Sequence, residues 1–160
     1  MRGVNYRIVK KMRQFIPFAA YSTAMDDNRA KPLLRKINSV KEFHEKFRIG
    51  WREKPEGKLQ EWEYRLRHRL MQKENEEYLD GCKKGDLAEI ADALGDELYI
   101  LFGTILKHGL QNKIDEVFDE IHRSNMSKLD ESGQPIFRED GKILKSKNYF
   151  KPDIKRAIGK

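Results

Sequence analysis

Apolar and polar positions follow a helical period along most of the chain after residue 38. Ser39 and Glu42 have the spacing of a capping box, which predicts that a short helix begins at Ser39. Three longer helical stretches follow over about residues 59–79, 86–107 and 112–127. The first should end at the turn Asp80-Gly81, and Asp86 is the expected N-cap of the second. Because the connections between them are short, neighbouring helices should pack antiparallel, as in a helical bundle.

The helical period ends beyond residue 129. Two turn signals, Glu131-Ser-Gly133 and Glu139-Asp-Gly141, flank short extended segments and predict a small β-hairpin or flap within residues 130–160. The sequence thus predicts an all-α fold, an antiparallel bundle of about four to five helices with this C-terminal hairpin or flap. Residues 39–160 are expected to form one domain, preceded by an N-terminal extension at residues 1–38.

The net charge of +7 is confined to one end of the chain. Residues 1–36 contain nine basic and two acidic residues, which account for the whole excess, and the remaining 24 basic and 24 acidic residues balance. The extension is therefore basic and the domain is neutral. Four interpretations of the extension stand together: a flexible arm, a sequence upstream of a true start at Met25, a targeting segment, or an arm for nucleic acid or a membrane surface.

Two of the predicted helices carry carboxylates on stripes that would otherwise face the core. Glu74 and Glu77 continue the stripe of Leu66 and Leu70 at spacings that return to one helix face. The next helix places three acids on one face in the same way: Glu89, Asp92 and Asp96. Carboxylates on a core-facing stripe are costly unless they are paired or bind a metal ion. Since hard Mg²⁺ prefers oxygen ligands, the stripes predict a Mg²⁺ site between the helices; ordinary surface ion pairs are the alternative.

These segments resemble a known group of enzymes. The match consists of Lys73-Glu74-Asn-Glu-Glu77, Glu89-Ile-Ala-Asp92-Ala-Leu-Gly-Asp96-Glu-Leu-Tyr99, Phe43-His-Glu-Lys-Phe47, His122-Arg-Ser-Asn-Met-Ser-Lys128, and the segments 141–145 and 148–153. It covers roughly residues 39–154. The chain is similar there to the all-α nucleoside triphosphate pyrophosphohydrolases, the superfamily of the MazG-like enzymes, the dimeric dUTPases and phosphoribosyl-ATP pyrophosphohydrolase.

The resemblance implies a set of Mg²⁺ ligands, with Mn²⁺ as a substitute metal: Glu74, Glu77, Glu89 and Asp92, with Asp96 as a nearby alternative. It also implies that water attacks the α-phosphorus of a nucleoside or deoxynucleoside triphosphate and that pyrophosphate leaves. Glu74 is the expected general base, with Glu77 as the second catalytic residue. Lys73 stands where the family has its first glutamate, which puts a second metal ion in doubt. Lys73 either meets a phosphate or sits at the edge of the stripe.

Six residues outside the carboxylate stripes are candidate substrate contacts: Arg123, Asn125, Lys128, Lys142, Lys145 and His44. Within the matched segment, Arg123 and Lys128 are expected to donate charge-assisted hydrogen bonds to phosphates; the alternative is that they only complement a helix C-terminus. Asn125 could donate to a phosphate or read a base edge. Lys142 and Lys145 would close over the phosphates from the predicted flap, or remain solvated. The aromatic residues flanking His44 form either a base-stacking wall or plain core.

The predicted partner is a second copy of the chain. The helix at 86–107 is apolar nearly all round, so another surface should cover it, which favours a homodimer or a dimer of dimers. No apolar run approaches the roughly 20 residues that span a bilayer, and the single Cys82 fits a reducing, cytoplasmic compartment, or an organelle if the extension is a targeting segment. The competing function is a helical nucleotide- or nucleic-acid-binding module without catalysis, in which nucleic acid is contacted through the N-terminal arm.

Overall fold

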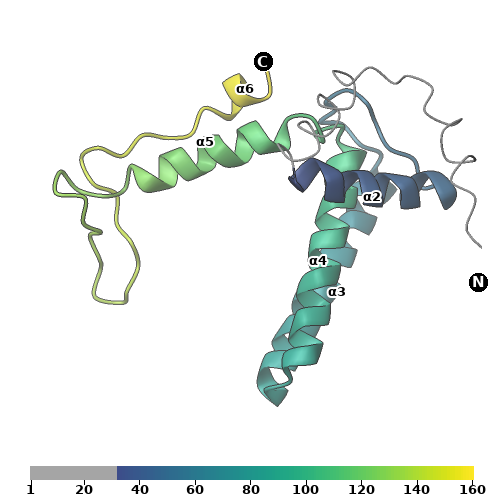
Figure 1. Ribbon diagram of the computed structural model, residues 1–160, viewed down its shortest axis with the longest axis horizontal. Coiled ribbons are helices and arrows are strands. Elements are labelled where there is room, and N and C mark those ends of the chain that lie inside the picture. The colour runs from purple at the N-terminus through teal and green to yellow at the C-terminus, as the bar shows by residue number, and fades with distance from the viewer. Residues whose placement is uncertain (1–31) are drawn as a thin grey trace, which may run out of the picture.

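The computed structural model describes residues 32–160 (Figure 1). Within this range the chain forms the helices α2 (Pro32–Lys46), α3 (Glu61–Lys84), α4 (Leu87–Lys107), α5 (Ile114–Met126) and α6 (Ile154–Ala157). No residue from 32 onward belongs to a named strand, so the predicted all-α class is confirmed. In the same range, no helix has the length and apolar character needed to cross a membrane. The N-terminal extension lies outside the described residues as far as residue 31.

Helices α3 and α4 form an antiparallel hairpin that extends as an arm from the rest of the molecule (Figure 1). Gly85 makes the turn, since its φ of 68° lies in the left-handed region that favours glycine. Asp86 then caps α4 by accepting hydrogen bonds from the backbone N–H groups of Ala88 at 2.9 Å and Glu89 at 3.2 Å. The predicted cap at Asp86 is therefore confirmed.

The predicted end of the first long helix at residue 79 is wrong. Helix α3 continues through Asp80 and Gly81 to Lys84. Gly81 faces α4 so closely that a Cβ added to it would lie 3.1 Å from the Ile90 side chain. This glycine allows two helices to approach each other, and the helix ends only at the next glycine along the chain.

The predicted start of the first helix at Ser39 is also wrong, because α2 begins at Pro32. Proline suits the first helical position, where a backbone N–H would have no partner within the helix. Ser39 lies inside the helix, and its hydroxyl donates to the carbonyl of Arg35 at 3.3 Å. The domain boundary predicted between residues 38 and 39 consequently falls within α2.

A small apolar core lies where α2 crosses the C-terminal part of α4. Its buried members are Ile37, Val40, Ile105 and Leu106, and Leu33, Trp51, Phe102, Leu110 and Ile114 pack against them. This core anchors the base of the α3–α4 arm, and the Gly85 turn forms the far tip.

An ion cluster next to the core joins the loop before α3 to both helices of the arm. Glu63 is 5% exposed and accepts hydrogen bonds from Arg52 at 3.0 Å and from Lys107 at 2.6 Å. Lys107 is also buried and donates to the carbonyl of Ile49 at 3.1 Å. The guanidinium of Arg52 and the ammonium of Lys107 lower the pKa of Glu63 to about 2. The cluster therefore satisfies charges that would be costly to bury alone.

Helix α5 leads away from the arm and packs against α6, so residues 32–160 of one chain do not form the predicted bundle. The structure does not support the predicted β-hairpin either. Within residues 130–160 a single antiparallel bridge joins Phe137 and Ile143, between backbone hydrogen bonds of 2.8 Å. Both bridged side chains are more than half exposed, so no buried apolar face stabilises longer strands.

Candidate functional site

The α3 side of the candidate site is built on a buried glutamate. Glu74 is 4% exposed, and its Oε2 atom has no hydrogen-bond partner among the described residues. Its Oε1 atom accepts a hydrogen bond from the ammonium of Lys73 at 3.2 Å. Burial raises the pKa of Glu74, because removal from water penalises the charged carboxylate more than this pairing relieves it. A buried carboxylate oxygen without a hydrogen-bond partner is costly, and binding of a cation or a water molecule would offset that cost.

Lys73 links this glutamate to the next one on the same face. Its ammonium lies 2.5 Å from Glu77 Oε1, in an i, i+4 pair, while it also contacts Glu74. The pairing lowers the pKa of Glu77 and raises that of Lys73. The position that departs from the family pattern thus carries a cation bound to both predicted α3 ligands.

The α4 side of the site faces the same region across a hollow of about 220 Å³ near the tip of the arm. The hollow is lined by Glu77, Asp80, Lys84, Glu89, Asp92 and Ala93. Lys84 pairs with both oxygens of Glu89, at 2.7 Å and 3.0 Å. Asp92 has no ion pair within residues 32–160, and Asp96 lies one helical turn farther along α4, outside the lining of the hollow. The structure therefore places three of the predicted ligands around one hollow.

Two charged residues that line the hollow were not predicted from the sequence: Asp80 and Lys84. Asp80 was assigned to a turn, but the continuation of α3 places it one turn beyond Glu77. Lys84 reaches Glu89 across the Gly85 turn. The short separation of five residues across a Gly-Asp turn is the signal that could have revealed this pair.

The carboxylates fit a divalent cation in donor chemistry. All are oxygen donors, and one oxygen of Glu74 is buried without a hydrogen-bond partner in the part of the chain that the structure describes. Within residues 32–160, however, no three carboxylate, histidine or cysteine side chains converge closely enough to hold an ion. Two lysines instead balance the acids: Lys73 on α3 and Lys84 at the turn. The Mg²⁺ site stays a prediction, and a bound ion would have to displace or share these pairings.

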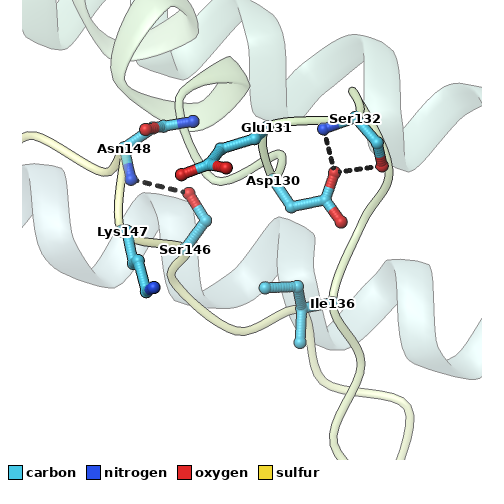
Figure 2. A pocket seen from close by; sticks show the side chains of 7 residues that line it. All are labelled: Asp130, Glu131, Ser132, Ile136, Ser146, Lys147 and Asn148. Atoms are coloured by element: carbon cyan, nitrogen blue, oxygen red, sulfur yellow. Dashed lines mark hydrogen bonds between the residues drawn. The ribbon is translucent and has the colours of Figure 1, made fainter.

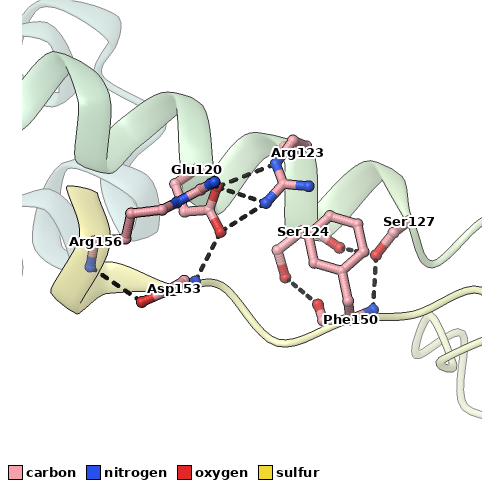
Figure 3. A network of polar contacts seen from close by, with 7 residues as sticks. All are labelled: Glu120, Arg123, Ser124, Ser127, Phe150, Asp153 and Arg156. Atoms are coloured by element: carbon pink, nitrogen blue, oxygen red, sulfur yellow. Dashed lines mark hydrogen bonds and ion pairs between the residues drawn. The ribbon is translucent and has the colours of Figure 1, made fainter.

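The segment predicted to contact phosphate holds the C-terminal end of the chain against α5 (Figure 3). Arg123 pairs with the buried carboxylate of Glu120 at 2.8 Å and lies over the ring of Phe150, 4.2 Å from its centroid. Ser124 donates to the carbonyl of Phe150 at 2.8 Å, and the Phe150 N–H donates to Ser127 Oγ at 3.2 Å. We call residues 146–158 the C-terminal strap. Arg123 anchors this strap, and its proposed phosphate contact stays a prediction.

Glu120 is the centre of this anchor and was not singled out from the sequence. It is 6% exposed, accepts the backbone N–H of Asp153 at 2.7 Å, and pairs with Arg156 at 3.1 Å in addition to Arg123. The Asp153 N–H and the two guanidinium groups hold the pKa of Glu120 below its ordinary value.

Four of the other predicted substrate contacts lie along α5 and the segment that follows it, away from the tip of the arm (Figure 1): Asn125, Lys128, Lys142 and Lys145. Lys128 donates to Asn125 Oδ1 at 2.8 Å. Lys142 is exposed in the bridged loop, and the ammonium of Lys145 lies 4.3 Å from the ring centroid of Tyr149. Within one chain, the structure does not bring these residues to the carboxylates.

His44 is 2% exposed, and its Nδ1 atom lies 3.0 Å from the carbonyl oxygen of Gly50. Burial lowers its pKa, so it favours the neutral imidazole. The flanking rings do gather: Phe43 and Phe47 are 4.3 Å apart at their centroids, and Tyr99 of α4 meets Phe43 edge-on at 5.6 Å. Phe47 is 65% exposed, so this aromatic cluster has an open face.

A second hollow, of about 320 Å³, lies within the C-terminal loops (Figure 2). Its polar groups serve the local turn. Asp130 accepts from the N–H and hydroxyl of Ser132 at 2.8 Å and 2.6 Å, and the Asn148 N–H donates to Ser146 Oγ at 3.0 Å. We assign this hollow no ligand.

The region that contains the carboxylates matches a known protein family. A family model for phosphoribosyl-ATP pyrophosphohydrolase matches residues 40–125, which are 86 of the 160 residues. The matched span runs from α2 to α5 and contains all of the predicted metal ligands. A search of curated proteins gives no match to the chain.

Proposed function

The chain belongs to the phosphoribosyl-ATP pyrophosphohydrolase family, within the MazG-like all-α pyrophosphohydrolase superfamily, and from this premise we propose its reaction. Members of this family are hydrolases of phosphoric anhydride bonds. The proposed reaction is hydrolysis of a nucleoside or deoxynucleoside triphosphate to the monophosphate and pyrophosphate, dependent on Mg²⁺ or, as a substitute, Mn²⁺. The role would be control or sanitation of the nucleotide pool.

One observation carries the proposal: Glu74 is buried with an oxygen that has no hydrogen-bond partner among the described residues, and it lies one turn along α3 from Glu77, which lines a hollow together with carboxylates of α4. In the proposed site, Glu74 and Glu77 of α3 and Glu89 and Asp92 of α4 would hold the metal, with Asp96 as the alternative ligand on α4. A bound divalent ion would neutralise charge on the triphosphate and lower the pKa of a bound water.

Glu74 is proposed to accept the proton of the water that attacks the α-phosphorus. Its burial supports this role, because burial raises its pKa from the ordinary range of a glutamate toward that of a general base. Glu77, one turn along the helix and on the rim of the hollow, would orient the same water or metal. Pyrophosphate leaves as the bond between the α-phosphorus and the bridging oxygen breaks.

The proposed assembly is a homodimer or a dimer of dimers. It is supported by a row of large apolar side chains left open on the arm, each at least 43% exposed: Leu79, Leu87, Leu94, Leu98 and Leu101. Several large apolar side chains left exposed on one helical hairpin are typical of an interface. A second arm packed against the first would complete a helical bundle. The partner could also supply Arg123, Asn125, Lys128, Lys142, Lys145 or His44 to the substrate.

The test is a screen of canonical and modified triphosphates for Mg²⁺-dependent release of pyrophosphate. The wild-type chain should release pyrophosphate from at least one of them, and Glu74→Gln should reduce the rate by about 10²–10⁴-fold. Glu76→Gln is the matched control, since Glu76 is an exposed glutamate on the same helix, two residues along and hydrogen-bonded to Gln72. No pyrophosphate from any triphosphate with metal present would refute the proposed reaction. Nucleotide binding in that case would favour the non-catalytic binding module.

A further inference from the structure

Helix α5 carries an exposed stripe that changes from apolar to polar along its length. Its members follow one another at spacings of three, four and three, which return to one helix face: Phe118, Ile121, Asn125 and Lys128. Phe118 is 64% exposed and Ile121 is 41% exposed, so nothing within residues 32–160 covers the apolar half. At the other end, Lys128 donates to Asn125 and has no acidic partner among the described residues. We call these four residues the α5 stripe.

The α3 side of the arm carries a stripe with the same order of properties. From the base of the arm to its tip, at spacings of four, seven, four and three, its members are Trp62, Leu66, Lys73, Glu77 and Asp80. Trp62 is 65% exposed and Leu66 is 37% exposed, whereas Glu77 and Asp80 line the acidic hollow. We call these five residues the arm stripe. It is apolar near the base of the arm and acidic at the tip.

We propose that the α5 stripe of one copy of the chain docks along the arm stripe of a second copy, so that Asn125 and Lys128 complete the candidate site of that second copy. The two apolar halves would then cover each other, which removes exposed apolar surface from water. The role given to Asn125 and Lys128 rests on the proposed function, whereas the docking itself does not.

Charge complementarity favours a second copy as the occupant and sets its direction. Residues 73–97 at the tip contain nine acidic and three basic residues, a net charge of −6. Residues 128–160 contain nine basic and five acidic residues, a net charge of +4. Opposite charges on facing surfaces fix the register of an interface and disfavour the reversed orientation. The C-terminal end of α5 should therefore lie at the acidic tip.

The lengths of the two stripes agree with this register. At the helical rise of 1.5 Å per residue, Phe118 and Lys128 are about 15 Å apart, and Leu66 and Glu77 are about 16 Å apart. With the helices parallel and Phe118 against Leu66, Lys128 lies beside Glu77. Within one chain α5 leads away from the arm, so this contact needs a second copy (Figure 1).

The docking leaves the row of exposed leucines on α4 free for another contact. Leu94 belongs to that row and lies two residues from both Asp92 and Asp96 in the sequence. It is therefore about 200° around the helix from these acids, on the opposite face of the arm. A chain that uses both faces has two different interfaces, as in a dimer of dimers.

Cross-linking of the full chain tests the docking independently of activity. In a Cys82→Ser background, Phe118→Cys with a size tag is mixed with untagged Leu66→Cys under mild oxidation. A disulfide-linked dimer of one tagged and one untagged chain is expected, and it can join only two copies. Leu94→Cys in place of Leu66→Cys is the matched control on the opposite face, and it should give only background. No mixed dimer, or equal yields from the two mixtures, would overturn the docking.

Co-expression of variants tests whether two copies share the site. Lys128→Met should lower pyrophosphate release by about 10–100-fold, as for the loss of one charge-assisted hydrogen bond. Lys155→Met, which replaces an exposed lysine of α6, should keep the wild-type rate. Glu74→Gln and Lys128→Met co-expressed in equal amounts should recover about one quarter of the wild-type rate. Random pairing sets an intact carboxylate cluster against an intact lysine at about one site in four.

No recovery in the co-expressed pair, or full activity of Lys128→Met alone, would overturn the shared site. If the wild type itself releases no pyrophosphate, the proposed function fails, and the cross-link still decides the docking. Circular dichroism checks that each variant is folded, which is expected because Phe118 and Leu66 are exposed.

Discussion

Replacing Glu63 by glutamine should destabilise the fold strongly, although the change preserves the size and shape of the side chain. Glu63 accepts from Arg52 and from the buried Lys107, and these partners lower its pKa from 4.5 to about 2. A difference of that size corresponds to about 3 kcal/mol at full strength. Arg52 is 31% exposed, so water screens part of the interaction and about 2 kcal/mol remains. Lys107 would also be left buried without its counter-charge, so we expect a loss of about 2–4 kcal/mol.

Urea unfolding followed by circular dichroism measures this loss directly. Glu61→Gln is the matched control, because Glu61 lies one half-turn away on the same helix and pairs with Arg65 at 2.6 Å, with both side chains at least 64% exposed. Its replacement should cost less than about 0.5 kcal/mol. The double change Glu63→Gln with Lys107→Met should recover part of the loss, since no buried charge is then left unpaired. If Glu63→Gln were no more destabilising than Glu61→Gln, the ion cluster would not stabilise the fold.

The difference in stability between wild type and Glu63→Gln should also depend on pH. Because the folded-state pKa of Glu63 is depressed, its stabilising effect is fully present above pH 4.5 and is lost as the pH falls toward about 2. Wild type and Glu63→Gln should therefore differ most near neutral pH, and their unfolding free energies should converge between about pH 5 and pH 2. A difference that stays constant across this range would refute the electrostatic explanation.

Three further outcomes are expected. Gly103→Ala should lower the melting temperature, because the new Cβ would lie 2.8–2.9 Å from a buried guanidinium and a buried imidazole. Gly95→Ala, whose Cβ meets nothing within 4 Å, should instead raise the stability by about 0.5–1 kcal/mol. Calorimetric melting distinguishes the two variants, and equal shifts in melting temperature would contradict the packing described. Glu120→Gln should speed hydrogen exchange and proteolysis in the C-terminal strap, while Glu116→Gln on the same helix should not; equal protection of the strap in both would mean that Glu120 does not anchor it. Removal of divalent metal with a chelator should abolish pyrophosphate release, and added Mg²⁺ or Mn²⁺ should restore it; turnover that persists in the chelator would refute the metal dependence.

Sequence patterns located the helices well and their ends less well. The period of apolar residues and the Asp86 cap predicted the α3–α4 hairpin, because both depend on residues close together in the sequence. The end of α3 was misplaced because Gly81 is read from sequence as a helix stop, and only the contact with Ile90 reveals that it packs inside the helix. The β-hairpin was predicted wrongly for a similar reason, since tertiary contacts that the sequence does not reveal decide whether strands form. Turn signals were present, but nothing buries the bridged residues.

The candidate site was predictable to a similar depth. The spacing of the carboxylates identified Glu74 and Glu77 correctly as neighbours on one face. Of the predicted core-facing stripe, however, only Glu74 is buried, since Leu66 is 37% exposed and the Glu77 side chain is 50% exposed. The sequence could not show which lysines pair with the carboxylates, because the groups that a flexible lysine can reach depend on where the opposite helix lies. Lys84 is the clearest case, since its pair with Glu89 forms only after the chain reverses at Gly85.

That reversal has a consequence for how the protein folds. The carboxylates of both helices lie within residues 74–92, so a single helical hairpin brings them together, while the apolar core must join Ile37 to Leu106 from distant parts of the chain. Contacts that are local in sequence close at a low entropic cost and tend to form early. The acidic end of the arm should then assemble before the core that anchors it, and a nascent chain would carry its carboxylate hollow before it has a completed hydrophobic interior.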